Sequence, residues 1–334
     1  MASTVQKLTQ VGLINPPNFL PNNTQYETMM GSVAYGVSSD TSDCDIYGFC
    51  IPPKNVIFPH LSGEILGFGR QIQRFEQYQK HHIRDPDALG GKGRSYDFAI
   101  YNIVKFFQLC MENNPNMVDS LFTPINCVLH STKIGDMVRE NRQVFIHKGA
   151  WHKFKGYAYS QLHKIRTREQ IREGEAKILA WEEANSKGEK VGPKPKYRSV
   201  AGKRRANIID KGYDTKFAYH VVRLLDEVEQ ILETGDLDLQ RAKEHMKAVR
   251  RGEVPLEEIK ALFEIKQKEL EKLYHNSKLP KKPNEETIKN LLINCLEEHY
   301  GSLEKAIVLP DRFEQVLREI SEIANRTLYG NQQN

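Results

Sequence analysis

The stretch Gly31–Phe49 reads GSVAYGVSSDTSDCDIYGF, and it decides the fold class of this chain. Asp43 and Asp45 lie two positions apart where the sequence turns apolar, as expected at the start of a strand. Side chains alternate along a strand, so both carboxylates face one side while Cys44 and Ile46 point into a core. Two neighbouring carboxylates repel each other, and a hard divalent cation with a preference for oxygen ligands, such as Mg²⁺, resolves that repulsion.

Upstream of the aspartate pair, Gly31 and Ser32 end a predicted strand, Gln25–Met30. Their backbone N–H groups and the serine hydroxyl are suited to hold a phosphate, because glycine lets the backbone approach closely. Each half of this pattern has an ordinary alternative when taken alone. The alternative for Asp43 and Asp45 is a surface strand with two acids, and the alternative for Gly31-Ser32 is a plain turn. The two halves at this interval form a more specific signal than either one.

The order Gly31-Ser32, ten residues and then Asp43-Cys44-Asp45 resembles the signature of the DNA polymerase beta-type nucleotidyltransferase superfamily. Within that superfamily, the whole string resembles predicted nucleotidyltransferases linked to RNA-repair and RNA-ligase gene neighbourhoods. The similarity covers roughly Gln25 to Leu239 and continues in three further segments, Tyr96–Phe122, Phe154–Leu162 and Tyr213–Leu225. The resemblance implies an α+β fold, in which an N-terminal mixed sheet with flanking helices precedes a mainly α-helical domain that closes over a nucleotide.

The resemblance also implies the chemistry, which is two-metal in-line displacement at the α-phosphate of an NTP. Asp43, Asp45 and a third carboxylate would hold Mg²⁺, with Mn²⁺ as an alternative ion, and would be the catalytic residues. Asp97 is the best match for the third carboxylate, because it opens the predicted strand Asp97–Asn102 and faces away from its apolar neighbours. A plain surface aspartate is the alternative.

The nucleotide-binding candidates come from two places. Near the signature they are Gly31, Ser32, Ser38 and Ser39. The predicted helix Asp214–Thr234 adds Lys216, His220 and Arg223, which share one stripe beside an apolar stripe. Such a helix suits the wall of a triphosphate cleft. The alternative is a solvated face on which Glu227 is an ion-pair partner.

Composition bounds the class of protein. The chain has 334 residues and a net charge of +5, and no apolar stretch is long enough for a membrane span, which predicts a cytoplasmic protein with no membrane partner. Five scattered cysteines argue against a disulfide framework. We predict a catalytic domain over residues 1–132 and a helical domain over residues 133–334 that carries a flexible basic loop at about 185–206.

Two basic segments are candidates for binding RNA. Ser186–Arg205 holds eight basic residues and one acid, and its prolines and glycines disfavour a helix. The other segment, Lys155–Arg166, also carries aromatic side chains that could stack on bases. The candidate side chains are Lys155, Tyr157, Lys164, Arg166, Lys203, Arg204 and Arg205. The alternative for Ser186–Arg205 is a solvated linker. The alternative for the aromatic side chains of Lys155–Arg166 is a place in the core.

The remaining elements are predicted from periodicity and from proline and glycine positions. Further strands are expected at Cys44–Ile51 and Gln73–His81. Helices are expected at Thr4–Gly12, Asn102–Asn113, Asp136–His147, Tyr157–Ala184, Leu256–Tyr274, Glu285–His299 and Asp311–Leu328. His81, His82, Asp85 and Asp87 are assigned to a lid or connector rather than to a metal site.

Three functions are compatible with these residues. The leading hypothesis is transfer of an NMP from an NTP to a nucleic-acid end, with an RNA or tRNA 3′ end favoured by the basic loop. The second is nucleotidylation of a protein or small molecule, as in adenylylating toxins and antibiotic-modifying relatives. The third is a module that binds NTP or RNA without chemistry. The resemblance fits a bacterial or phage origin, and the base, the acceptor and the oligomeric state are not encoded in any recognisable motif.

Overall fold

The computed structural model describes residues 2–38, 43–63, 73–197 and 199–303, and beyond them Val316, Leu317, Ile320, Ser321 and Ile323. Two predictions therefore lie outside the described residues: the assignment of Ser39 and almost all of the helix expected over Asp311–Leu328.

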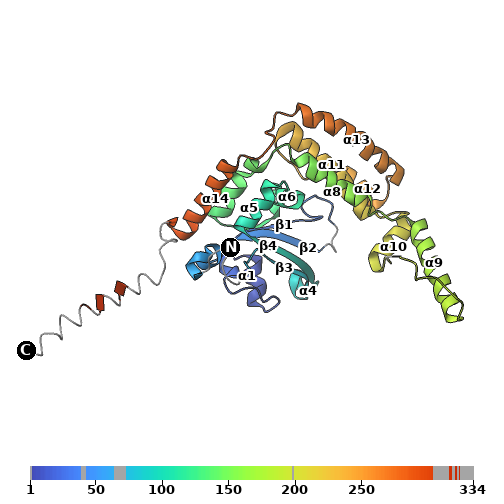
Figure 1. Cartoon of the computed structure of the whole chain (residues 1–334), viewed down its shortest axis with the longest axis horizontal. Helices are drawn as coiled ribbons and strands as arrows, with labels where there is room; N and C mark the ends of the chain where they lie inside the picture. The colour runs from blue at the N-terminus through green and yellow to red at the C-terminus, as the bar shows by residue number, and fades with distance from the viewer. Residues whose placement is uncertain are drawn as a thin grey trace, which may run out of the picture.

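The N-terminal part is built on a five-stranded mixed sheet with the strand order β3-β4-β2-β1-β5 (Figure 1). The strands are β1 (Thr24–Met29), β2 (Cys44–Cys50), β3 (Gln77–Asp85), β4 (Arg94–Asn102) and β5 (Val128–Ser131). β2 and β4 run parallel, and the other neighbouring pairs are antiparallel. This sheet, followed by a mostly helical part, confirms the predicted α+β fold class. β5 was not predicted, because four half-buried residues give no clear alternation.

The two faces of the sheet pack against different parts of the chain. Cys44 and Ile46 of β2 and Phe98 and Ile100 of β4 belong to a small core shared with the N-terminal segment. That segment holds α1 (Thr4–Gln10) and α2 (Leu20–Asn23), and α1 lies on the opposite side of the sheet from α5 and α6 (Figure 1). Alternation along β2 and β4 therefore directs the side chains between these residues toward the helical part.

Short helices follow or connect the strands, and several of them contribute side chains to the core on this second face. They are α3 (Lys54–Ile57), η1 (Pro59–Ser62), α4 (Ala88–Gly91), α5 (Ile103–Met111), α6 (Pro115–Phe122), η2 (Ile125–Cys127), α7 (Lys133–Glu140) and η3 (Arg142–Phe145). Asn102 caps α5 by accepting a 3.0 Å hydrogen bond from the Val104 N–H, and Asn114 caps α6 in the same way through the Asn116 N–H. These caps fix where each helix leaves its preceding segment.

The helical part is organised around α11. Its long helices are α8 (Ala150–Leu162), α9 (Arg168–Ser186), α10 (Gly202–Lys211), α11 (Thr215–Thr234), α12 (Lys243–Arg251), α13 (Leu256–Asn276) and α14 (Glu285–Tyr300). α11 packs against α8, α12 and α13, and most of its side chains are buried. Asp214 accepts from the Phe217 N–H at its start, and Gly235 ends it in the left-handed conformation.

The single helix predicted over Tyr157–Ala184 is wrong, because the chain breaks between α8 and α9. Thr167 caps α9 through the Gln170 N–H, and the Gln170 side chain accepts from the Thr167 N–H in return. This reciprocal pair is a capping box, whose Thr-x-x-Gln pattern marks a helix start in the sequence. Hydrophobic periodicity alone did not reveal this helix start.

The segment 168–211 forms an arm of two helices that projects from the body (Figure 1). Its base is narrow: Thr167 and Tyr213 form an isolated β-bridge, and the Arg168 N–H donates to the Gly212 carbonyl at 2.8 Å. The predicted flexible loop at about 185–206 is only partly correct, because α10 begins at Gly202. Of the described residues between α9 and α10, none is in a helix or strand, as the prolines and glycines there suggested.

One large cluster of buried side chains includes residues from both sides of position 132. It runs from Tyr26 and Phe49 of the sheet to Leu224 of α11 and Leu296 of α14. The division into domains at 132 and 133 therefore stays a prediction, while the packing joins the sheet and the helices into a continuous core.

Candidate functional site

The signature turn and the aspartate pair are in direct contact. Residues 31–36 form turns after β1, and Gly31 has a φ of +65°. A Cβ built on Gly31 would lie 2.1 Å from Oδ2 of Asp45, so only glycine fits here. The Met30 N–H donates a 2.7 Å hydrogen bond to the Asp45 carbonyl and holds the turn against β2.

Asp45 and Asp97 are paired across the parallel strands β2 and β4. Burial raises the pKa of Asp45 above its ordinary value, and the charge of Asp97 raises it further. Lys216 and His81 act in the opposite direction on the same carboxyl group. The pair is therefore a site of unbalanced negative charge on the helical side of the sheet.

Asp43 is the most exposed of the three predicted carboxylates. It is exposed and lies one residue before β2, where its charge makes a smaller contribution to the pKa of Asp45. Within residues 2–38, 43–63, 73–197 and 199–303, no group of three His, Cys, Asp or Glu side chains is arranged to hold a metal ion. The convergence of Asp43, Asp45 and Asp97 on a metal ion therefore stays a prediction.

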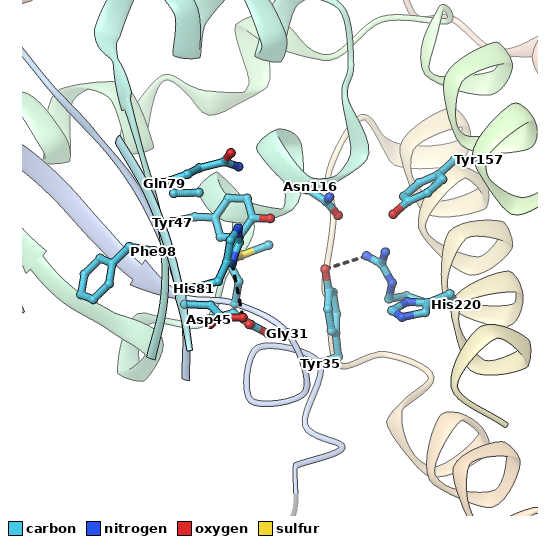
Figure 2. A pocket seen from close by; sticks show the side chains of 14 residues that line it. Gly31, Tyr35, Asp45, Tyr47, Gln79, His81, Phe98, Asn116, Tyr157 and His220 are labelled. Atoms are coloured by element: carbon cyan, nitrogen blue, oxygen red, sulfur yellow. Dashed lines mark hydrogen bonds and ion pairs between the residues drawn. The ribbon is translucent and has the colours of Figure 1, made fainter. Parts of the chain in front are cut away.

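A pocket of about 300 Å³ opens in front of the Asp45–Asp97 pair, between the sheet and the helical part (Figure 2). Its lining includes Gly31 and Tyr35 of the signature turn, Asp45 and Tyr47 of β2, Gln79 and His81 of β3, Asp97 of β4, Asn116 of α6, Tyr157 of α8, and His220 and Arg223 of α11. The helical part thus forms one wall of the pocket that contains the signature.

The α11 wall carries two of the three predicted phosphate ligands. His220 and Arg223 line the pocket, whereas Lys216 is exposed one turn earlier and acts on Asp45 through its charge. Burial lowers the pKa of His220 well below its ordinary value, and the surrounding cations Arg223, Lys216, Arg250 and Lys164 lower it further. His220 is therefore a neutral imidazole among positive charges.

Arg223 is hydrogen-bonded and ion-paired within the protein, and its assignment to the nucleotide stays a prediction. It is only 2% exposed, and its Nη1 donates to the Tyr35 hydroxyl at 2.6 Å and to Glu227 at 2.9 Å, and also contacts Asp119. The Tyr35 hydroxyl donates to Asp119 at 2.6 Å. Burial raises the pKa of both Asp119 and Glu227. Glu227 forms the ion pair that the alternative included, but both side chains are buried rather than on a solvated face.

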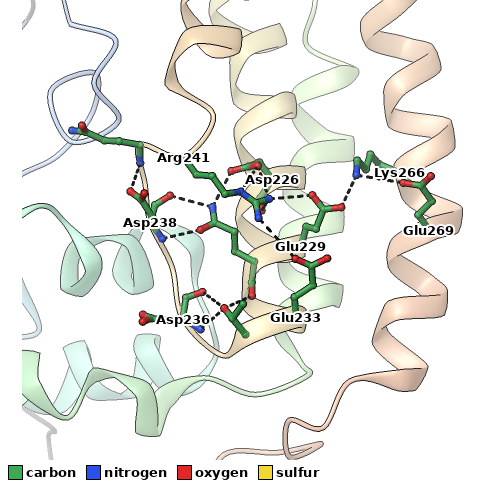
Figure 3. Close-up of polar contacts among 11 residues, drawn as sticks. Asp226, Glu229, Glu233, Asp236, Asp238, Arg241, Lys266 and Glu269 are labelled. Atoms are coloured by element: carbon green, nitrogen blue, oxygen red, sulfur yellow. Dashed lines mark hydrogen bonds and ion pairs between the residues drawn. The ribbon is translucent and has the colours of Figure 1, made fainter.

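The signature turn is also supported from the segment after α11. Gln240 donates through Nε2 to the Ala34 carbonyl at 3.1 Å. Its neighbour Arg241 is held by Asp226 at 2.7 Å and Glu229 at 3.1 Å, and Glu229 also pairs with Lys266 of α13 at 2.5 Å (Figure 3). The turn therefore rests on the helical part at two points, Tyr35 and Ala34.

The remaining nucleotide-binding candidates are less well placed. Ser32 is half-buried in the turn, and Ser38 is exposed beyond it. Ser39 lies outside the described residues.

The predicted RNA-binding residues fall into two groups. Tyr157 lines the pocket, Lys164 and Arg166 are exposed just beyond the C-terminus of α8, and the Lys155 ammonium lies 5.0 Å from the Trp151 ring. On the arm, Lys203 is exposed. Arg204 pairs with Asp214 at 2.7 Å and Arg205 with Glu175 at 2.7 Å. Two of the three basic candidates on the arm are thus engaged in ion pairs within the protein.

Sequence reasoning missed five pocket residues that carry polar groups on their side chains: Tyr35, Tyr47, Gln79, His81 and Asn116. Tyr35 and Tyr47 lie inside the quoted signature, and their spacing from Gly31 and Asp45 was the available signal. Gln79 and His81 reach the site only because β3 pairs with β4, which no local pattern specifies.

Comparisons with known proteins bear on the family. A model of the RNA repair pathway DNA polymerase beta family (RlaP) matches residues 9–318. No curated protein matches the sequence. The crystal structure at 1.90 Å of a nucleotidyltransferase-like protein from Exiguobacterium sibiricum 255-15 is 9% identical over 81% of this chain and 75% of that chain, with a TM-score of 0.26. Similarity at that TM-score establishes nothing further.

A membrane span is not among the elements found, since none of the helices in the described part of the chain is long and apolar enough to cross a bilayer. The match over residues 9–318 includes the signature turn, the Asp45–Asp97 pair and the α11 wall. The chain belongs to the RNA repair pathway DNA polymerase beta family, whose members are polymerase-beta-type nucleotidyltransferases.

Proposed function

We propose that this protein transfers an NMP from an NTP to the 3′ end of an RNA. One observation carries the proposal. Asp45, which packs against Gly31, and its strand neighbour Asp97 face α11 across one pocket. Acidic groups on one side suit divalent ions, and the exposed cations Lys216 and Lys164, which act on His220 on the other side, suit phosphates.

The carboxylates fit a divalent cation. Asp45 and Asp97 are adjacent oxygen donors whose mutual repulsion contributes to the raised pKa of Asp45, and a bound cation would remove that penalty. Asp43, one residue before β2, would complete the donor set. When bound, Mg²⁺ supplies stabilisation of the charge on the attacking and leaving oxygens.

The chain's own residues then have distinct roles. The Gly31–Ser32 backbone and the Ser32 hydroxyl position the β- and γ-phosphates, with Lys216 supplying charge. The oxygen of the acceptor hydroxyl forms a bond to the α-phosphorus as the bond to the bridging oxygen breaks and pyrophosphate leaves. Asp97 accepts the proton of that hydroxyl.

RNA is the proposed acceptor because the chain belongs to an RNA-repair family and has cations beside the pocket. Lys164 and Arg166 are exposed at the end of α8, whose Tyr157 lines the pocket. An RNA end entering along α8 would meet these cations before it reaches the carboxylates.

The test is incorporation of label from each of the four α-labelled NTPs into total RNA with Mg²⁺ present. We expect labelled RNA 3′ ends, no labelling of periodate-blocked RNA, and a loss on the order of 10²–10³-fold for Asp45→Asn and Asp97→Asn. Asp210→Asn, an exposed aspartate on α10, is the matched control.

Other outcomes separate the rival functions. Labelling that survives both substitutions would reject the proposed mechanism. Label carried by protein or by a small molecule from cell extract would identify a different acceptor. NTP binding by calorimetry without pyrophosphate release on any RNA would indicate a binding module.

A further inference from the structure

β3 contains a bulge directly opposite Asp97. Lys80 pairs with Phe98 and Ile83 pairs with Tyr96, so two residues of β3, His81 and His82, face the single residue Asp97 on β4. Such two-against-one arrangements interrupt the ladder and turn a backbone group away from its usual partner. The bulge lies at the one position of β4 that carries a candidate catalytic carboxylate.

The backbone at the bulge has an uncommon conformation. His82 has a φ of +56°, in the left-handed region that residues other than glycine rarely adopt. Its side chain is 87% exposed, so burial of the imidazole does not explain the conformation. What this conformation does present to Asp97 is a backbone group.

That group is the His82 N–H, which donates a 2.6 Å hydrogen bond to Oδ1 of Asp97. The second carboxylate oxygen, Oδ2, lies 3.5 Å from Nδ1 of His81, which also lines the pocket. The His82 ring is more distant, at 4.0 Å from Oδ1. Both oxygens of Asp97 are thus approached from β3, one by a backbone donor and the other by an imidazole.

We propose that the His81–His82 bulge is a positioning device for Asp97. Asp97 lies beside the like charge of Asp45 and is 24% exposed, so repulsion and solvent would both favour a carboxylate that rotates away from the pair. The His82 N–H holds one oxygen on the β3 side and thereby fixes the plane of the carboxylate. His81 and His82 are positioning residues, and this role rests on the proposed function of Asp97.

Substitutions at His82 test the backbone role, because the residue type decides whether a positive φ is tolerated. Glycine accepts this conformation, alanine accepts it poorly and β-branched valine resists it. The expected order of kcat is therefore His82→Gly above His82→Ala above His82→Val. We expect valine to lower kcat at least tenfold while the KM for NTP stays within about twofold of the wild-type value.

Leu89 provides the matched control, since it is exposed and has the same φ of +56° but lies in α4, away from the pocket. Leu89→Gly and Leu89→Val should leave kcat unchanged. Equal kcat for the glycine and valine variants of His82 would overturn the inference, and so would an equal loss in both of the valine variants.

A second measurement does not depend on activity or on the folding of the valine variant. In the wild-type protein the residue 82 amide proton should be shifted downfield and protected from exchange, and Asp97→Ala should abolish both effects. An unprotected amide in the wild type would overturn the inference. If Asp97→Ala abolishes transfer while His82→Val does not lower kcat, only the positioning role fails; if transfer survives Asp97→Ala, the proposed function fails.

Discussion

The two walls of the pocket differ in how their charges are balanced. On the sheet wall, Asp45 and Asp97 lie side by side, and Lys216 and His81 offset their repulsion only in part. On the α11 wall, the buried Arg223 is surrounded by Asp119, Glu227 and the Tyr35 hydroxyl. A charged side chain beside a pocket is therefore not always available to a substrate. We propose that the sheet wall accepts a cation, whereas the arginine of the α11 wall already pairs with buried carboxylates of the protein.

The largest expected effect concerns the sheet wall. Gly31→Ala would place a methyl group against the Asp45 carboxylate, and displacement of that group should lower nucleotidyl transfer on the order of 10²-fold or more. Gly12→Ala is the control, because Gly12 also has a positive φ but nothing lies within 4 Å of its Cβ position. Equal activity of the two variants in a labelled-NTP assay would show that the contact with Asp45 is unimportant.

Arg223→Met should destabilise the α11 wall, because it leaves the carboxylates of Asp119 and Glu227 in the core without their cation. Removing one partner of a buried ion cluster costs about 3–5 kcal/mol of unfolding free energy. Urea denaturation would measure the loss, and the exposed Lys216→Met should change the same quantity by less than about 0.5 kcal/mol. A stable Arg223→Met protein would contradict the structural role of the arginine.

Lys216→Met should instead affect substrate binding. Because Lys216 is exposed on the pocket side of α11, its loss should raise the KM for NTP by up to about tenfold, and the effect should shrink at high salt. Lys268→Met, on the exposed surface of α13, should leave KM unchanged. A salt-independent change in KM would indicate a steric rather than an electrostatic cause.

The smallest effect is a pH dependence at His220. Its pKa in the folded protein lies well below 6.5, so the unfolded chain binds a proton that the folded chain does not as the pH falls through 6.5. Wild-type stability should therefore decrease between pH 7 and pH 5, and His220→Gln should reduce that decrease. Thermal denaturation at the two pH values would measure it, and identical slopes would place His220 in water rather than among Arg223, Lys216, Arg250 and Lys164.

The sequence was sufficient to predict contacts between residues that are close in the chain. Gly31 and Asp45 belong to one string, and their contact follows from a strand, a turn and a second strand in succession. Phe98 and Ile100 were expected in a core on the face opposite Asp97, and the structure buries both.

Features that depend on distant partners could not be predicted. The bulge at His81–His82 requires the register of β3 on β4, and the pairing of Arg223 with Asp119 requires α6 to pack on α11. The sequence showed a cation on a helix stripe, but burial decides whether such a cation serves a ligand or a neighbouring carboxylate. The convergence of Asp43 with Asp45 and Asp97 stays a prediction for a similar reason, because spacing along one strand does not fix how far an end residue extends into solvent.

The narrow base of the arm has an evolutionary consequence. The chain leaves the body at Arg166 and returns at Asp214, whose N–H donates to the Arg166 carbonyl at 2.9 Å. Because the two ends already meet, insertions and deletions between them would cost little in loop closure and would leave the fold of the body intact. The length of this hairpin can therefore change without altering the fold around the pocket.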